Sequence, residues 1–189
     1  AGVPIGSQGL FTLPYWNGAL TPYWDQNARG AVIGYSGIHQ NGHLFRSILE
    51  GISFELRVCL ESAAATLREP LERLITMGGG ARSALWCQML ADILRIPITI
   101  ARSEEATALG AAMLAAAAVG MHADVRTAAR EMSGRGQTFE PNLENAAEYD
   151  KYGSNRLAEG KLPLCAEMCS TKSLLAGDGE IIASIYKER

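Results

Sequence analysis

The chain has 189 residues, of which 48% are hydrophobic and 20% charged, a mixture typical of a folded domain with its own core. The formal net charge is −3 and no run of Lys and Arg occurs, which argues against nucleic acid or an anionic membrane as a partner. The longest apolar stretch, Leu109 to Val119, is too short to span a bilayer. Ala1 to Gly6 contain no apolar signal core, so we expect a cytoplasmic protein. They also lack an initiator Met, so we expect the sequence to begin partway through a longer chain.

The cysteines and histidines do not form a metal-binding pattern. Cys165 and Cys169 have the spacing of half a site, but tetrahedral zinc needs further ligands in a recognisable frame. We therefore expect reduced thiols and no metal ligand. The remaining cysteines and histidines are scattered: Cys59, Cys87, His39, His43 and His122.

The predicted elements begin with an apolar run over residues 8–16 and a short strand over 31–35. Asn41 and Gly42 then open a helix whose apolar row repeats every four residues. That row contains Leu44, Ile48, Ile52, Leu56 and Leu60.

The middle of the chain alternates between strands and helices. Strands are predicted at residues 71–77 and 97–101, and helices from Ser83, which is a suitable cap, and over 106–119 and 124–132. Strand followed by helix implies parallel strands with helices packed on the sheet, so the fold class is α/β. After Tyr149 the pattern weakens, and the tail receives no role.

The strongest local feature is the unit of strand, glycines and helix around Gly78, Gly79 and Gly80. Three glycines allow positive φ and leave no side chain in the way of a ligand. The amides that begin the next helix would then face a phosphate or nucleotide. It is not a Walker A loop, because no Gly-Lys-Ser/Thr follows. On residues alone, a tight turn without a ligand is an equally good interpretation.

The segment Gly78-Gly79-Gly80-Ala81-Arg82-Ser83-x-Leu85-Trp86-x-Gln88 resembles the adenosine-side motif of the FGGY carbohydrate kinases, especially xylulokinases. Further segments of this chain resemble segments of the family and occur in the same order: Pro22-Tyr23-Trp24-Asp25 with Ala28-Arg29-Gly30, His43-Leu44-x-Arg46-Ser47-Ile48-Leu49-Glu50-Gly51, Glu105-Ala106-x-Ala108-Leu109-Gly110-Ala111-Ala112, and Phe139-Glu140-Pro141-Asn142. Family members often carry Glu-Arg where this chain has Ala19-Leu20, which bears on the substrate group rather than on the family.

The resemblance implies an actin-like, ribonuclease-H-like domain with a central mixed sheet, covering residues 1–152 and followed by an extension at 153–189. ATP and Mg²⁺ would be the cofactors, and a ketopentose such as xylulose the substrate. Alternatives are glycerol, ribulose or a hexulose, or an actin-like nucleotide-binding module without kinase activity. The family's catalytic base, an Asp, would lie in a missing N-terminal kinase domain, so this chain alone is expected to be inactive. An exposed face left by that missing domain would favour a homodimer.

The resemblance also assigns residues to the nucleotide site. The backbone of the glycine bend would contact the α-phosphate and ribose, and the start of the following helix would lie near the adenine. The residues assigned to this site are Gly78, Gly79, Gly80, Ala81, Ser83 and Ala84.

Several other residues receive structural interpretations. Asp25 is predicted to form a turn through local N–H groups, and an ion pair between Asp25 and Arg29 is an alternative to a phosphate contact. Glu50 is predicted to bond to a neighbouring loop, and the helix around Gly110 to be closely packed. Three tryptophans are expected in the core or at a domain interface: Trp16, Trp24 and Trp86.

Overall fold

A computed structural model describes residues 2–153 of the chain. The chain divides into two compact units, of which one comprises Ala1–Cys59 and Ala147–Arg189 and the other Leu60–Ala146. Helices α1 (Asn41–Leu67) and α5 (Leu143–Gly153) each run across this division in the sequence. The predicted extension at 153–189 lies outside the described residues apart from Gly153, as do Cys165 and Cys169.

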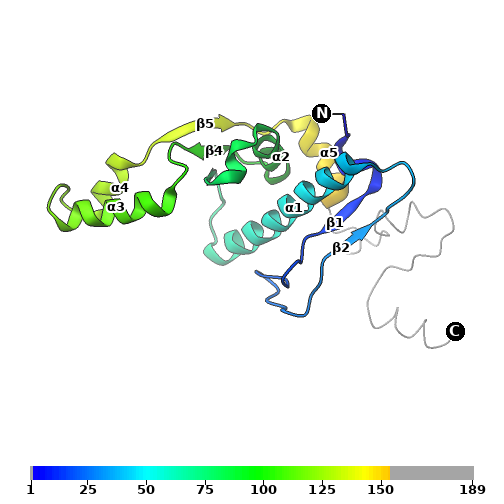
Figure 1. Cartoon of the computed structure of the whole chain (residues 1–189), viewed down its shortest axis with the longest axis horizontal. Coiled ribbons are helices and arrows are strands. Elements are labelled where there is room, and N and C mark those ends of the chain that lie inside the picture. Colours follow the sequence, from blue (N-terminus) through cyan, green and yellow to red (C-terminus); the bar gives the residue numbers. More distant parts are fainter. Residues whose placement is uncertain (1, 154–189) are drawn as a thin grey trace. The chain divides into compact units, whose positions relative to one another are not determined.

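The first unit contains an antiparallel pair of strands, β1 (Phe11–Leu13) and β2 (Ala31–Ile33), which lie side by side in Figure 1. A short 3₁₀ segment, Ile5–Gly9, precedes them. Helix α1 packs closely on β1, since a Cβ atom added to Gly51 would lie 2.1 Å from the carbonyl oxygen of Thr12. Glycine at position 51 is therefore required for this contact, and a hydrogen bond of 2.8 Å between Thr12 Oγ1 and Ser47 Oγ lies beside it.

A buried carboxylate holds the start of the chain to α1. Glu50 is 4% exposed and accepts hydrogen bonds from Gly6 N (3.0 Å), Ser7 Oγ (3.3 Å) and Arg46 Nε (2.7 Å). The predicted bond from Glu50 to a neighbouring loop is thus confirmed. The bound segment is left-handed, with φ of 73° at Gly6, 47° at Ser7 and 54° at Gln8, a conformation that costs energy for non-glycine residues.

Tyr15 makes a second contact to α1 by donating a hydrogen bond of 3.2 Å to Glu55 Oε2. Burial and the Glu55 carboxylate raise the pKa of Tyr15 from 10.0 to about 12. A raised folded-state pKa means that this contribution to stability is complete below pH 10 and is lost as the pH rises towards 12. Burial also raises the pKa of Tyr152, so we expect ultraviolet absorbance titration to show more than one tyrosine ionising late, and Tyr15→Phe to remove the contribution of one tyrosine from that late step. An unchanged titration curve in the variant would contradict the assignment.

The second unit contains a mixed sheet with strand order β3 (Leu74–Thr76), β4 (Ile98–Ala101) and β5 (Arg135–Phe139). Strands β3 and β4 are parallel, with Leu74 opposite Ile98, as the alternation of strands and helices predicted. Strand β5 pairs antiparallel with β4 and was not predicted, because four of its five residues are exposed and polar or glycine, without apolar alternation.

The core of this unit is formed by α2 (Ala84–Leu94), whose buried side chains include Cys87, Met89, Leu90 and Ile93. Asp92, 2% exposed, accepts hydrogen bonds from Asn142 N (2.8 Å) and Asn145 Nδ2 (2.9 Å). This carboxylate therefore fixes the first turn of α5 to α2.

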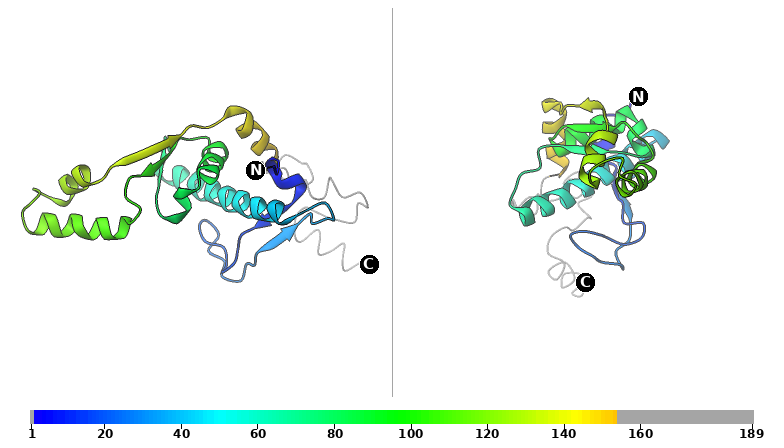
Figure 2. Two further views of the ribbon diagram at one scale, coloured as in Figure 1. Left: turned by 45° about the horizontal axis from the view of Figure 1, so that its top comes forward. Right: turned by 90° about the vertical axis from the view of Figure 1, so that its left-hand side faces the viewer.

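Helices α3 (Ala106–Ala118) and α4 (Val125–Met132) lie side by side in the same unit (Figures 1 and 2). Asp124 caps α4, so the prediction of a helix at 124–132 is confirmed. On α3 just one side chain, that of Ala116, is buried, and nothing lies within 4 Å of a Cβ added to Gly110. The close packing predicted around Gly110 is therefore wrong, since within residues 2–153 no neighbouring element packs against α3 at this residue.

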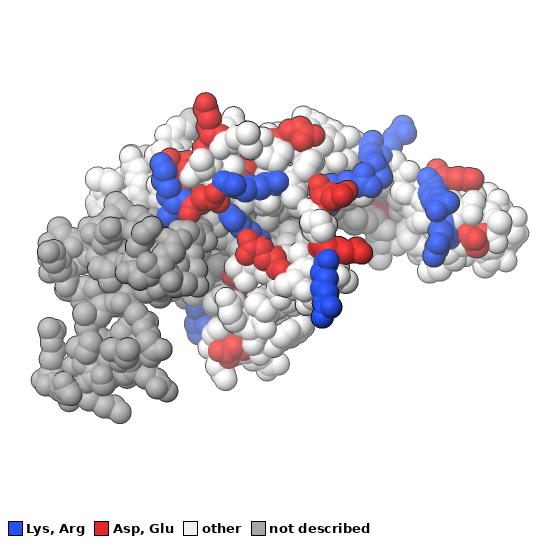
Figure 3. Space-filling model, turned by 180° about the vertical axis from the view of Figure 1, so that it is seen from behind, with Lys and Arg blue, Asp and Glu red and all other residues white. Residues whose placement is uncertain are grey.

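Exposed surface of the described residues is mixed in charge and contains large apolar side chains. On the face shown in Figure 3, Lys and Arg lie beside Asp and Glu without a large area of one sign. The side chains of Trp16 and Trp24 are 55% and 72% exposed, so neither tryptophan belongs to the core of the described residues. Among residues 2–153, no helix combines the length and apolar character needed to cross a membrane.

Candidate nucleotide site

The predicted glycine bend connects β3 to α2 in the second unit. Gly78 has φ 83° and ψ −173°, a conformation that L side chains rarely adopt, so glycine is required there. A 3₁₀ turn over Gly79–Arg82 follows, and Ser83 caps α2 by accepting a hydrogen bond of 3.3 Å from Trp86 N. The predicted capping role of Ser83 is confirmed, and its hydroxyl group is engaged in the cap.

The three glycines differ in what surrounds them. A Cβ atom added to Gly78 or Gly79 would meet nothing within 4 Å, whereas one added to Gly80 would lie 2.7 Å from Cζ3 of Trp86. Gly78 and Gly79 thus leave their backbone accessible from outside, and Gly80 allows the indole ring to pack on the bend. The open side of the bend is the part that suits close approach of a ligand.

A pocket of about 370 Å³ lies beside the bend, at the carboxyl ends of the parallel strands β3 and β4. This is the edge at which open α/β sheets usually bind ligands. Of the predicted site residues, Gly78, Ala81 and Ala84 line this pocket, while Gly79, Gly80 and Ser83 lie next to them in the chain. The Ala81 amide donates to Gly78 O at 3.1 Å, so this N–H group is used within the bend.

The pocket is also lined by charged and polar residues that were not assigned to the site from the sequence. Arg82 forms an ion pair with Glu104 at the surface, and Arg102 follows directly after β4. Gly136 and Gln137 come from β5. The position of Arg102 at the end of a strand was a usable signal, whereas Gly136 and Gln137 belong to the strand that the pattern failed to reveal.

The remaining polar residues singled out from the sequence have structural roles in the first unit. Asp25 Oδ1 accepts a hydrogen bond of 2.8 Å from Asn27 N, so its predicted turn-forming role is confirmed. Arg29 donates to the carbonyl oxygens of Gln26 (2.8 Å) and Ala28 (2.9 Å) rather than to Asp25. The alternative of an Asp25–Arg29 ion pair is therefore wrong.

Among residues 2–153, no group of three or more His, Cys, Asp or Glu side chains is arranged to hold a metal ion. The described part of the chain offers accessible backbone at Gly78 and Gly79 and two arginines in the pocket lining, of which Arg82 is paired with Glu104. Such groups suit the phosphate of a nucleotide.

Comparisons with known proteins identify the family of the chain. Residues 3–119 match the C-terminal domain of the FGGY family of carbohydrate kinases. The chain is 35% identical over 147 residues to a xylulose kinase of Bacillus subtilis, covering 78% of this chain and 29% of that protein. It is 36% identical over 144 residues to a glycerol kinase of Limosilactobacillus reuteri, covering 76% and 29% respectively. The chain therefore spans about 30% of the length of such relatives.

Solved structures show the same relationship. Ligand-bound xylulose kinase from Lactobacillus acidophilus superimposes with a TM-score of 0.68 at 31% identity, over 78% of this chain and 30% of that one. The glycerol kinase of Plasmodium falciparum with ADP gives a TM-score of 0.66 at 24% identity, over 82% and 31%, which supports the fold. The expected actin-like α/β architecture with a mixed sheet is confirmed. This chain belongs to the FGGY family of carbohydrate kinases and represents part of its C-terminal domain.

Proposed function

We propose that this chain is the nucleotide-binding part of an ATP-dependent kinase that phosphorylates a small sugar or polyol. The observation that carries the proposal is the bend at Gly78 and Gly79, which is open to solvent beside a pocket in a chain of this family. Residues 1–152 would form the C-terminal domain and 153–189 an extension. Gly78, Gly79, Gly80 and Ala81 would hold the phosphates and ribose through their backbone, with Ser83 and Ala84 near the adenine.

The rest of the kinase would supply the chemistry. Phosphoryl transfer depends on positioning and charge stabilisation, so a nucleotide site without the sugar site and the base has little activity. Mg²⁺ is usually held by phosphates and one or two carboxylates, and we expect it to arrive with ATP rather than to bind this chain alone. Exposed apolar side chains, such as Leu20 (66%), Trp24 (72%) and Tyr35 (66%), are suited to contact an N-terminal lobe. In its absence the same exposed side chains would favour a homodimer.

Two substrate classes have support. A ketopentose such as xylulose is favoured by the xylulose kinases among the relatives, and glycerol by glycerol kinases of equal similarity, 35% and 36% identical. We place the ketopentose first because xylulose kinases also recur among the solved structures at 31% and 30% identity.

The test is a coupled assay of ADP release by the protein encoded by the complete reading frame, with xylulose, ribulose and glycerol as acceptors. We expect turnover with one acceptor to exceed that with the others by at least tenfold. The chain of 189 residues should show no turnover, and its mass in solution reports whether it dimerises. Binding of ADP without turnover on any acceptor would instead favour a nucleotide-binding module, and absence of both would contradict the proposal.

A further inference from the structure

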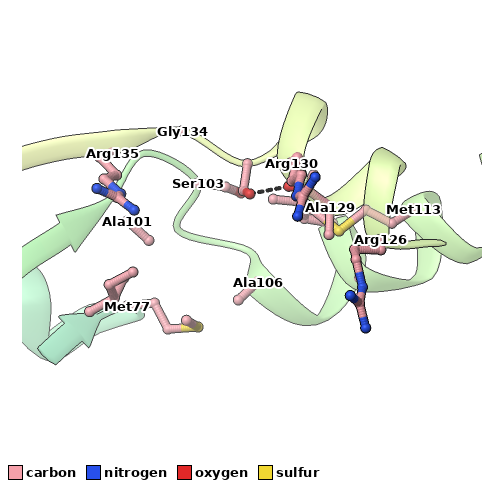
Figure 4. Close-up of a pocket in the computed structure, with 14 residues that line it drawn as sticks. Met77, Ala101, Ser103, Ala106, Met113, Arg126, Ala129, Arg130, Gly134 and Arg135 are labelled. Carbon is pink, nitrogen blue, oxygen red and sulfur yellow. Dashed lines mark hydrogen bonds between the residues drawn. The ribbon is translucent and has the colours of Figure 1, made fainter. Parts of the chain in front are cut away.

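A larger pocket, of about 610 Å³, lies in the second unit between the ends of β3 and β4 and the helices α3 and α4. Ile75, Met77, Leu109 and Met113 give it an apolar lining. Figure 4 shows Met77 on the strand side of this pocket and Met113 on the helix side. Pockets of roughly 300 to 1,000 Å³ with apolar walls are the usual size for a small organic ligand.

Three arginines also line this pocket: Arg126 and Arg130 from α4, and Arg135 from the start of β5 (Figure 4). Within residues 2–153 the structure shows no hydrogen-bond or ion-pair partner for any of these three guanidinium groups, and no Asp or Glu is among the residues that line the pocket. By contrast, Arg46 and Arg57 each bind a carboxylate. All three arginines are exposed, so the pocket combines an apolar lining with a positively charged rim that faces solvent.

Two of these charges come from one helix, α4. Asp124 begins the helix by accepting a hydrogen bond of 2.7 Å from Thr127 N. Arg126 and Arg130 then stand four residues apart, where like charges repel each other. Glu131, on the same helix, does not relieve this repulsion, because its carboxylate is 2.8 Å from Nδ1 of His122. A bound anion would offset the repulsion.

We propose that this pocket binds a small organic phosphate monoester with an apolar body, at a site separate from the glycine bend. The arginines hold the phosphate, since guanidinium groups match phosphate oxygens in geometry and charge. The methionines and Leu109 contact the apolar body. The pocket shares Met77 and Ala101 with the smaller one but contains none of Gly78, Gly79 and Gly80.

The test compares naphthyl phosphate with naphthol, its uncharged analogue, by calorimetric titration of the complete chain. We expect the phosphate to bind at least tenfold more tightly than naphthol, and Arg126→Gln with Arg130→Gln together to remove most of that preference. Arg68→Gln, a change of an exposed arginine that does not line the pocket, is the matched control and should preserve it. Equal binding of the two compounds to the unaltered chain would overturn the proposal.

A second variant tests the apolar part of the site without endangering the fold. Gly110 lines the pocket and a Cβ atom there meets nothing within 4 Å, so Gly110→Leu fills the space while improving helix propensity. We expect this variant to bind both compounds about tenfold or more weakly, and unchanged binding would contradict the site. Saturating ADP should leave naphthyl phosphate binding unaffected, and Gly79→Val should do so too. Displacement by ADP would show one shared nucleotide site and refute a separate one.

Discussion

Replacing Gly79 by valine is expected to abolish binding of ADP to this chain while leaving its stability unchanged. The unaltered chain, with half of a cleft, should bind ADP at about millimolar affinity, on the order of −4 kcal/mol. A side chain at Gly79 points into open space, so it costs no internal contact but blocks access to the backbone. Calorimetric or NMR titration with ADP should show at least a tenfold loss, and thermal unfolding should show the same midpoint as before.

The choice of position matters for interpreting this result. At Gly80 a side chain would clash with Trp86, and lost binding would then reflect a displaced indole ring. Gly37→Val is the matched control, because a Cβ atom there also meets nothing within 4 Å and the residue lies in the first unit. If Gly79→Val and Gly37→Val bind ADP equally well, the nucleotide site is not at this bend.

A substitution at Ala84 also tests this site, and we expect it to change stability and ADP affinity in opposite directions. It is the first residue of α2 and lines the pocket of about 370 Å³. A glutamate in the first turn of a helix is favourable for the helix, by about 0.3–1 kcal/mol. Ala84→Glu should therefore maintain or raise stability while reducing ADP affinity, because it adds bulk and a charged group where the adenine is proposed to lie. Reduced affinity in a destabilised variant would not support the site.

The sequence predicted those parts of the fold whose pattern is local. The parallel pair β3 and β4, the cap at Ser83 and the start of α1 at Asn41 follow from apolar periodicity and capping residues, and each is found. Strand β5 was missed because Arg135–Phe139 has no apolar alternation and is held by pairing with β4. Its existence depends on tertiary contacts, which a single sequence does not display.

The candidate site likewise has features that a local sequence pattern reveals and others that depend on tertiary contacts. The bend was found because glycines between a strand and a helix have a physical meaning that is visible in sequence. A Cβ atom would point into open space at Gly79 but against the Trp86 ring at Gly80; this contrast depends on where Trp86 packs, and no spacing rule predicts it. The prediction that Gly110 is closely packed failed for a related reason. Small residues on a helix indicate close approach of a neighbour, but the sequence does not say whether a neighbour is present.

Replacing Glu50 by alanine is expected to destabilise the chain by about 3–5 kcal/mol, because removing one member of a buried ion pair leaves the other charge uncompensated. The Glu50 side chain is 5% and that of Arg46 17% exposed. The change also removes the acceptor for Gly6 N and Ser7 Oγ, which hold the left-handed segment against its own strain. Urea denaturation should show the lower midpoint, and hydrogen exchange should show faster opening at residues 6–8.

A matched control separates burial from charge. Glu104→Ala breaks the Arg82–Glu104 pair, whose side chains are 68% and 55% exposed, and such surface pairs contribute little to stability. Glu50→Gln should fall between the two, because the amide oxygen still accepts a hydrogen bond but no longer neutralises Arg46. If Glu50→Ala costs no more than Glu104→Ala, the carboxylate does not hold the chain's first residues to α1. The left-handed turn would then have to be maintained by packing, such as that of Gly6 against Tyr152, where an added Cβ atom would lie 2.4 Å from the ring.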